Sequence, residues 1–221
     1  MSDLVVAIDG PSGSGKSTVA RGVAAALGLP VLDTGAMYRA VACAALRAAV
    51  PLDDHDAVAA LARAADIRVE AGVTTLDGDD VSTDIRGPEV TTAVSTVAAQ
   101  PAVREILVAR QRAWVAEHHG GVVEGRDIGT VVFPDAALKV YLTASDDERA
   151  RRRQLDEHAA ERSVALEAVK TSLERRDEID STRAVSPLRV ADDALVLDTT
   201  GRDADGVIAD VVHRARTVEA P

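Results

Sequence analysis

A glycine-rich segment near the start of the chain constrains the fold more than any other feature of the sequence. It runs from Gly10 to Thr18 as GPSGSGKST and fits the pattern G-x-x-x-x-G-K-[ST]. The apolar run Leu4–Ile8 precedes it, and the residues from Ser17 to Leu27 have helical spacing, with Gly28 just past their end. A strand, a tight loop and a helix in this order predict a phosphate-binding loop at the edge of a parallel sheet.

The rest of the chain alternates apolar runs of strand length with helical patterns, which is typical of a parallel α/β sheet flanked by helices. We expect four more strands in this sheet, at residues 31–32, 121–124, 137–142 and 195–197. We expect helices at residues 36–50, 56–65, 101–118, 146–157, 163–178 and 204–218. The prediction is therefore a five-stranded parallel sheet.

The alternation changes between residues 66 and 100. Residues 67–70 and 74–77 resemble short strands, and Asp77-Gly78 is a strong turn signal. Val81 to Ile85 is a candidate third strand that would pair with the segment before it. We predict a small antiparallel insertion and a following helix over 66–100, with a core domain formed by 1–65 and 101–221.

Composition excludes several classes of protein. Hydrophobic residues make up 47% of the 221 residues, which argues against general disorder, and the net charge of −11 disfavours binding to nucleic acid or to anionic membranes. No apolar run approaches the roughly 18 residues of a membrane-spanning helix, and no basic leader precedes the first apolar run. The single cysteine, Cys43, is best explained as a buried thiol in a reducing compartment. We expect a cytoplasmic protein.

The chemistry of the glycine-rich loop predicts binding of a nucleoside triphosphate and Mg²⁺. Its backbone N–H groups would surround the β-phosphate, Lys16 would reach the β- and γ-phosphates, and the Ser17 hydroxyl would ligate the metal. The candidate nucleotide-binding residues are Gly10, Pro11, Ser12, Gly13, Ser14, Gly15, Lys16, Ser17 and Thr18. The loop alone does not separate a kinase from other nucleotide hydrolases. We find no N-K-x-D element of a GTPase, whereas Val122-Val123-Glu124 also fits the acidic strand end of an ATPase.

Three further motifs give the chain a family resemblance. DTGAMYR at 33–39, EGRDIGT at 124–130 and DSTRA at 180–184, together with the phosphate-binding loop, resemble the bacterial cytidylate kinases over about residues 5–199. The resemblance includes the insertion after residue 66. It implies a P-loop kinase fold with a monophosphate-binding insertion and a short lid at 149–162. The implied activity is ATP-dependent phosphorylation of CMP, and of dCMP, with Mg²⁺.

The resemblance also implies roles for individual residues. Arg39, Arg126 and Arg183 would hold the acceptor phosphate, a task for which bidentate guanidinium groups are suited. Asp127 and Ser95 would accept from the cytosine amino group, and Arg104 would meet N3 and O2. The other positions have alternative roles. Thr34 and Tyr38 would bind the phosphate or line the pocket, and Arg176 and Asp180 would contact the sugar hydroxyls or phosphate oxygens. Glu124 and Asp33 would hold Mg²⁺ through water molecules, beside Ser17 as the direct ligand.

The arginine-rich run at 149–153 has two interpretations. It is either a solvated helix face with pairs such as Arg153 to Glu157, or a mobile lid that delivers arginines to the transferring phosphoryl group. We favour the lid, and we assign charge stabilisation during transfer to Lys16, Arg126, Arg183 and Arg153. No general base is needed, because a phosphate monoester with its second pKa near 6 is already anionic.

Alternative functions stay open at this point. The acceptor could be UMP, AMP or shikimate, and the chain could instead be an ATP-binding regulatory module without an acceptor. The small-molecule partners that we expect are ATP with CMP or dCMP, and we expect the chain to act as a monomer.

Overall fold

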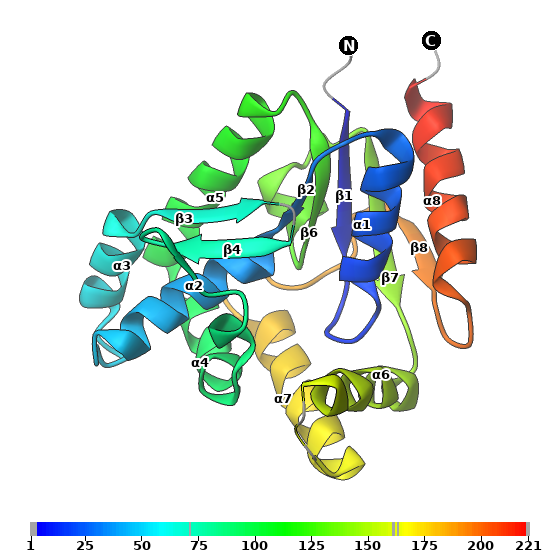
Figure 1. The fold of residues 1–221 in the computed structure, drawn as a ribbon. Helices are drawn as coiled ribbons and strands as arrows, with labels where there is room; N and C mark the ends of the chain where they lie inside the picture. The colour runs from blue at the N-terminus through cyan, green and yellow to red at the C-terminus, as the bar shows by residue number, and fades with distance from the viewer. Residues whose placement is uncertain (1–3, 71, 161, 163, 220–221) are drawn as a thin grey trace.

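The computed structural model describes residues 4–70, 72–160, 162 and 164–219, which form two sheets with helices packed around them (Figure 1). The larger sheet has five parallel strands in the order β2-β6-β1-β7-β8. Their bounds are β1 (Val5–Asp9), β2 (Val31–Asp33), β6 (Gly121–Gly125), β7 (Leu138–Thr143) and β8 (Leu195–Asp198). The predicted five-stranded parallel sheet is confirmed.

The helices agree with the predicted stretches to within a few residues at their ends. They are α1 (Lys16–Leu27), α2 (Thr34–Arg47), α3 (His55–Ala64), α4 (Pro88–Ala98), α5 (Pro101–Glu117), α6 (Asp146–Ala159), α7 (Leu166–Thr182) and α8 (Ala204–Glu219). Gly28 caps α1 in a left-handed conformation, as its position predicts. Over the described ranges, none of these helices has the length and apolar content to cross a membrane.

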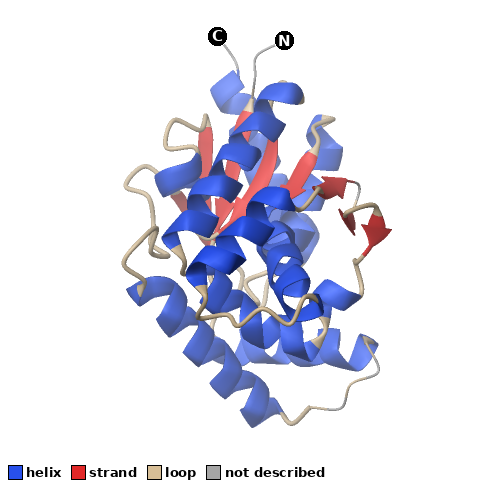
Figure 2. Cartoon of the chain, turned by 90° about the vertical axis from the view of Figure 1, so that its left-hand side faces the viewer, coloured by secondary structure: helices blue, strands red, loops and turns tan. Residues whose placement is uncertain are grey.

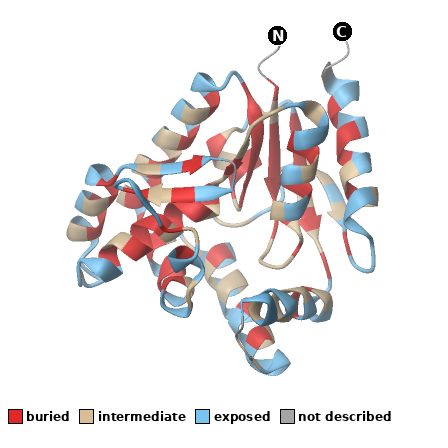
Figure 3. Ribbon diagram, in the orientation of Figure 1, coloured by how far each residue is buried: buried red, intermediate tan, exposed pale blue. Residues whose placement is uncertain are grey.

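Both faces of the large sheet are buried, which explains the continuous apolar run of β1. Ala7 joins the core on the side of α2, α4 and α5, whereas Val6 and Ile8 pack on the side of α1 and α8. Figure 2 shows helices covering the sheet, and Figure 3 shows its central strands as the most continuously buried part of the chain. Cys43 is buried in the first of these two cores.

The insertion forms a three-stranded antiparallel sheet of β3 (Ile67–Glu70), β4 (Val73–Leu76) and β5 (Asp79–Asp80). The candidate strand Val81–Ile85 is wrong, because β5 ends at Asp80. Val81 donates one backbone hydrogen bond to Thr74, and the chain then enters a short 3₁₀ helix. Ser82 donates from both its backbone N–H and its hydroxyl to the Asp80 carboxylate, and such local bonds compete with strand pairing.

The carboxyl ends of the strands point toward α6 and α7 (Figure 1). The phosphate-binding loop follows β1, the Asp33–Arg39 motif surrounds the end of β2, and the Arg126-Asp127 pair follows β6. Because the strands are parallel, these three motifs meet at one edge of the sheet, where ligands bind in open α/β folds.

Candidate functional site

The converging motifs enclose a cavity of about 360 Å³. Nearly all of the predicted site residues line it; among the predicted residues, only Gly10, Pro11 and Ser14 do not. The lining also includes residues that have no individual role assigned from the sequence: Gly35, Arg86, Val94, Ala98, Gly125, Arg152, Leu155 and Asp156. The roles assigned to the individual site residues stay predictions.

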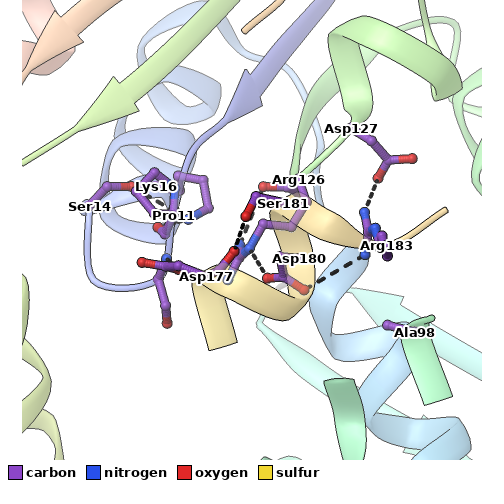
Figure 4. Close-up of polar contacts among 12 residues, drawn as sticks. Pro11, Ser14, Lys16, Ala98, Arg126, Asp127, Asp177, Asp180, Ser181 and Arg183 are labelled. Atoms are coloured by element: carbon purple, nitrogen blue, oxygen red, sulfur yellow. Dashed lines mark hydrogen bonds and ion pairs between the residues drawn. The ribbon is translucent and has the colours of Figure 1, made fainter. Parts of the chain in front are cut away.

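The phosphate-binding loop folds over the Lys16 side chain at one end of the cavity. Lys16 Nζ donates to the Pro11 carbonyl at 2.7 Å and lies 3.5 Å from Ser14 Oγ (Figure 4). Burial, and secondly the charge of Arg126, hold the pKa of Lys16 well below its usual value. A bound polyanion would restore the charged form, so the loop is suited to a phosphate ligand.

Arginine side chains from three elements meet in the middle of the cavity. Arg126 Nε donates to Asp180 at 2.9 Å, and Arg183 Nη1 lies 3.8 Å from the same carboxylate. Burial together with Arg126 and Arg39 lowers the pKa of Arg176 to about 9, and burial is also the first cause that lowers the pKa of Arg39. Despite burial, Asp180 raises the pKa of Arg126, whereas repulsion from neighbouring guanidinium groups adds to the effect of burial on Arg39 and Arg176. An anion bound among them would supply the missing charge.

A buried ion pair forms the far end of the cavity. Arg104 Nη2 donates to Asp127 Oδ2 at 2.5 Å, and Arg183 Nη2 lies 3.6 Å from Asp127 Oδ1 (Figure 4). The Arg104 guanidinium also lies 5.2 Å from the centre of the Tyr38 ring. Among the described atoms, Arg104 Nε has no hydrogen-bond partner although it is buried, and the Tyr38 hydroxyl is buried as well. These groups, with Ser95 beside them in the lining, offer donors and acceptors to a planar polar ligand.

The predicted metal-binding residues lie between the loop and β2. Ser17 Oγ donates to Glu124 Oε2 at 2.9 Å, and Thr34 Oγ1 donates to the Glu124 carbonyl at 2.7 Å. Burial, and secondly Asp33, raises the pKa of Glu124 to about 7. Asp33 Oδ1 caps α2 by accepting from Ala36 N at 3.0 Å, which leaves Oδ2 toward the cavity residue Arg86 at 3.8 Å. In the described part of the chain, no group of three or more His, Cys, Asp or Glu residues could hold a metal alone.

In the arginine-rich run at 149–153, some side chains form surface ion pairs and others line the cavity, so each of the two interpretations describes part of the run. Arg151 pairs with Glu148 at the surface, and Arg153 makes the predicted pair with Glu157 at 2.6 Å while it also lines the cavity. Arg152 lines the cavity and donates to the Thr199 carbonyl at 2.7 Å. Arg149 faces the phosphate-binding loop instead, where it donates to the Ser12 carbonyl at 3.0 Å and pairs with Asp177.

Sequence reasoning missed two carboxylates that contact the site motifs. Asp177 accepts from the Ser12 N–H at 3.3 Å, so that it and Arg149 hold the N–H and the carbonyl of the same loop residue, on the two peptide groups that flank its Cα. Asp9 accepts from the backbone N–H groups of Ile128 and Gly129, at 2.8 Å each. A charged residue at the end of a buried strand was the available signal for Asp9; nothing in the sequence pattern marked Asp177.

Comparisons with known proteins agree with the geometry. The family model described as cytidylate kinase matches residues 6–217. A cytidylate kinase from Mycobacterium avium is 53% identical over 202 residues, covering 90% of this chain and 89% of the relative. A cytidylate kinase from Rhodococcus opacus is 52% identical over 215 residues, covering 94% and 92%. A bifunctional pantoate ligase/cytidylate kinase from a Synechococcus strain is 52% identical over 202 residues, which are 88% of this chain but only 37% of that protein.

Solved structures share the fold at low sequence identity. An uncharacterized protein from Eubacterium ventriosum matches with a TM-score of 0.52 and 12% identity, covering 99% of both chains. A shikimate kinase from Acinetobacter baumannii in complex with shikimate matches with a TM-score of 0.50 and 14% identity, covering 99% of this chain and 96% of that one. At these identities the likeness concerns the fold alone.

Proposed function

The chain belongs to the cytidylate kinase family, and we propose that it uses the cavity at the carboxyl edge of the sheet to transfer the γ-phosphoryl group of ATP directly to the phosphate of CMP. Family membership makes the chain an enzyme, an ATP-dependent nucleoside monophosphate kinase. It also disfavours the other acceptors and the regulatory module that the sequence had left open. The further assignments below concern the residues that perform this reaction.

The unbalanced arginine cluster is the single observation that best supports the acceptor assignment. Arg39, Arg126 and Arg176 are half-buried around one cavity that also contains the phosphate-binding loop, and the pKa values of Arg39 and Arg176 are lowered. Two polyanions that must approach each other need positive charge between them. We assign Arg39, Arg126 and Arg183 to the acceptor phosphate, and Arg176 with Asp180 to its oxygens or to the sugar hydroxyls.

The phosphate-binding loop supports the assignment of the site for ATP, the phosphoryl donor. Residues Gly10–Thr18 would hold the phosphates of ATP, with Lys16 released from the Pro11 carbonyl to reach the β- and γ-phosphates. Arg153 lines the same cavity from α6 and would stabilise the transferring group, as would Arg126 and Arg183. The attacking oxygen of CMP is already anionic near pH 7, so this mechanism requires no general base.

The ion pair at the far end of the cavity suits cytosine. Asp127 and Ser95 would accept from the N4 amino group, while Arg104 would donate to N3 and O2, with Nε, which has no protein partner, supplying one of these two bonds. Uracil carries an oxygen where cytosine carries the amino group, and that oxygen would face the Asp127 carboxylate. Such a mismatch of buried acceptors disfavours UMP by roughly 10²-fold. Thr34 and Tyr38 would complete the pocket wall.

The residues near the loop fit Mg²⁺ as a cofactor. Ser17 would ligate it directly, and Glu124 and Asp33 would act through bound water, because Mg²⁺ is usually held by few protein oxygens together with phosphates. Bound Mg²⁺ would neutralise charge on the β- and γ-phosphates. Single substitutions of these three residues should each shift the Mg²⁺ concentration needed for half-maximal activity. An unchanged Mg²⁺ dependence in all three would contradict the assignment.

We also propose that dCMP is accepted and that the enzyme acts as a cytoplasmic monomer. Every residue of the proposed site comes from one chain, and no residue has been assigned to the 2′-hydroxyl alone. The free thiol of Cys43 is compatible with a reducing compartment.

The test is ADP formation from ATP with CMP, dCMP, UMP, AMP or shikimate as acceptor. We expect fast, Mg²⁺-dependent turnover with the two cytidine nucleotides, and UMP roughly 10²-fold behind in kcat/KM. Turnover with another acceptor would overturn the base assignment, whereas ATP hydrolysis independent of every acceptor would overturn the kinase. Arg126→Met should lose activity with CMP, while the exposed Arg68→Met serves as a charge-matched control outside the cavity.

A further inference from the structure

Asp9 is a buried carboxylate that the reaction described above does not use. It is the last residue of β1, directly before the phosphate-binding loop, and only 5% of its surface is exposed. Both of its oxygens accept hydrogen bonds of 2.8 Å, Oδ1 from the Ile128 N–H and Oδ2 from the Gly129 N–H. These donors lie 119 and 120 residues away in the sequence.

The two N–H groups open a single turn of π-helix over Ile128–Val132. The first N–H groups of a helix lack partners within it and are commonly satisfied by the side chain of the preceding residue. Here the preceding residue, Asp127, makes no side-chain cap and points its carboxylate toward Arg104 instead. Asp9 therefore supplies the cap from a different strand and leaves the Asp127 carboxylate free for the cavity.

The turn is fixed on other sides as well. The Asp127 carbonyl accepts from Val131 and Val132 at 2.9 and 3.1 Å. A Cβ on Gly129 would lie 3.1 Å from Lys139 Cγ, so the turn packs closely on β7. Asp9 is thus the group that ties the backbone next to Asp127 to the end of β1, the same strand end from which the phosphate-binding loop begins.

Burying a carboxylate costs free energy unless hydrogen bonds satisfy its oxygens. Burial raises the pKa of Asp9 to about 6, and the backbone bonds from Gly129 and Ile128 oppose this rise. Two charged groups act on it from neighbouring elements: Asp127, which raises its pKa, and Lys16, which lowers it. A neutral amide in the same place has one acceptor oxygen and would present an NH₂ group to the second N–H.

We propose that Asp9 is a positioning residue for base selection: by capping the turn after β6, it sets the place of the Asp127 carboxylate and thereby the discrimination between a cytosine and a uracil monophosphate. This inference rests on the proposed function, since it needs Asp127 to contact the base.

The experiment compares Asp9→Asn with wild type for CMP, UMP and ATP. We expect the KM for CMP to rise about tenfold and the CMP-to-UMP ratio of kcat/KM to fall about tenfold, the effect of losing one buried hydrogen bond. The KM for ATP should change much less. The matched control is Asp135→Asn, the same substitution on an exposed residue between the turn and β7, outside the cavity. It should leave all three constants unchanged.

A double-mutant comparison tests whether Asp9 acts through Asp127. In the Asp127→Asn background, Asp9→Asn should cause no further loss of the CMP-to-UMP ratio. An equal rise of the KM for ATP and for CMP, with the ratio preserved, would overturn the proposal and make Asp9 a support of the loop alone. If Asp9→Asn does not fold, Asp9→Ser removes the carboxylate with less bulk and is judged by the same ratio. A wild-type enzyme that does not prefer CMP to UMP would instead refute the proposed function.

Discussion

Breaking the buried ion pair between Arg104 and Asp127, at the end of the cavity proposed to bind the base, should destabilise the fold unequally, depending on which partner is removed. The side chains of Arg104 and Asp127 are 3% and 5% exposed, so neither charge can be solvated by water in place of its partner. Removal of one partner of such a pair costs about 3–5 kcal/mol. Asp127 serves two guanidinium groups, since Arg183 lies 3.6 Å from its other oxygen.

The two single variants therefore fall at opposite ends of that range. Arg104→Met leaves the Asp127 carboxylate with Arg183 and should cost about 3 kcal/mol. Asp127→Asn removes the carboxylate that pairs with Arg104 and leaves Arg183 with Asp180 at 3.8 Å, and it should cost about 5 kcal/mol. The double variant should be more stable than the two losses together predict, by about 1–3 kcal/mol, because the charges are removed jointly. A domain is expected to have a total stability of about 5–15 kcal/mol, so Arg104→Met should still fold, and Asp127→Asn should fold if the wild-type stability exceeds about 5 kcal/mol.

Urea unfolding followed by the fluorescence of Trp114 measures these losses. Trp114 is the only tryptophan of the chain and lies on α5 with Arg104. Arg68→Met, which breaks the exposed pair with Asp66, is the control and should leave the midpoint unchanged. The reasoning is refuted if Arg104→Met is as mild as this control, or if Asp127→Asn costs less than Arg104→Met.

Three further predictions concern the loop and its supports. Gly13→Ala should cost about 1–3 kcal/mol of stability and raise the KM for ATP, because Gly13 has a φ of +80° and a Cβ there would lie 2.9 Å from the Arg149 carbonyl oxygen. The control in thermal unfolding is Gly201→Ala, which should cost less because Gly201, with a φ of +66°, has no atom within 4 Å of an added Cβ. Asp177→Asn should raise the KM for ATP about three- to tenfold, because it weakens the hydrogen bond that Asp177 accepts from Ser12, while the neighbouring Glu178→Gln should leave this KM unchanged. Equal KM values for ATP in these two variants, measured by steady-state assays, would contradict a role of the Asp177–Ser12 bond in ATP binding. The folded pKa of Asp9, about 6, lies above its ordinary 3.8, so its contribution to stability is full below pH 3.8 and lost as the pH rises through 6. Asp9→Asn lacks this titration, so its stability relative to wild type should rise by about 2–3 kcal/mol from pH 4 to pH 7 in urea titrations, and a pH-independent difference would contradict the raised pKa.

Local sequence signals predicted most of the fold. The apolar run of β1 and the Gly15-Lys16-Ser17 register specify a strand, a loop and a helix without any distant contact. The helix periods predicted every helix except α4 to within a few residues, and α4 was predicted only as a helix within 66–100. The Val81–Ile85 strand failed because a side-chain bond between Ser82 and Asp80 redirects the backbone, which hydrophobic patterning does not reveal.

The contacts that support the site were harder to predict than the residues that line it. The π-helix after Asp127 has no local signature, since its first N–H groups are capped by Asp9 from the other end of the sequence. Asp177 reaches Ser12 across 165 residues. A single sequence gives the types of residue that can bind phosphate, but such pairings depend on how the elements pack.

One helix end contacts three of the motifs that line the cavity. Asp177 and Asp180 on α7 and its C-cap residue Arg183 follow one another at intervals of three residues, and they contact Ser12 of the loop, Arg126 and Asp127 respectively. Figure 4 shows the last two of these contacts. A rigid rotation or shift of α7 therefore cannot alter one of these contacts without altering the others. The proposed donor and acceptor subsites therefore share a mechanical element, and we expect that a ligand in one of them that shifts α7 would change the geometry that the other substrate meets.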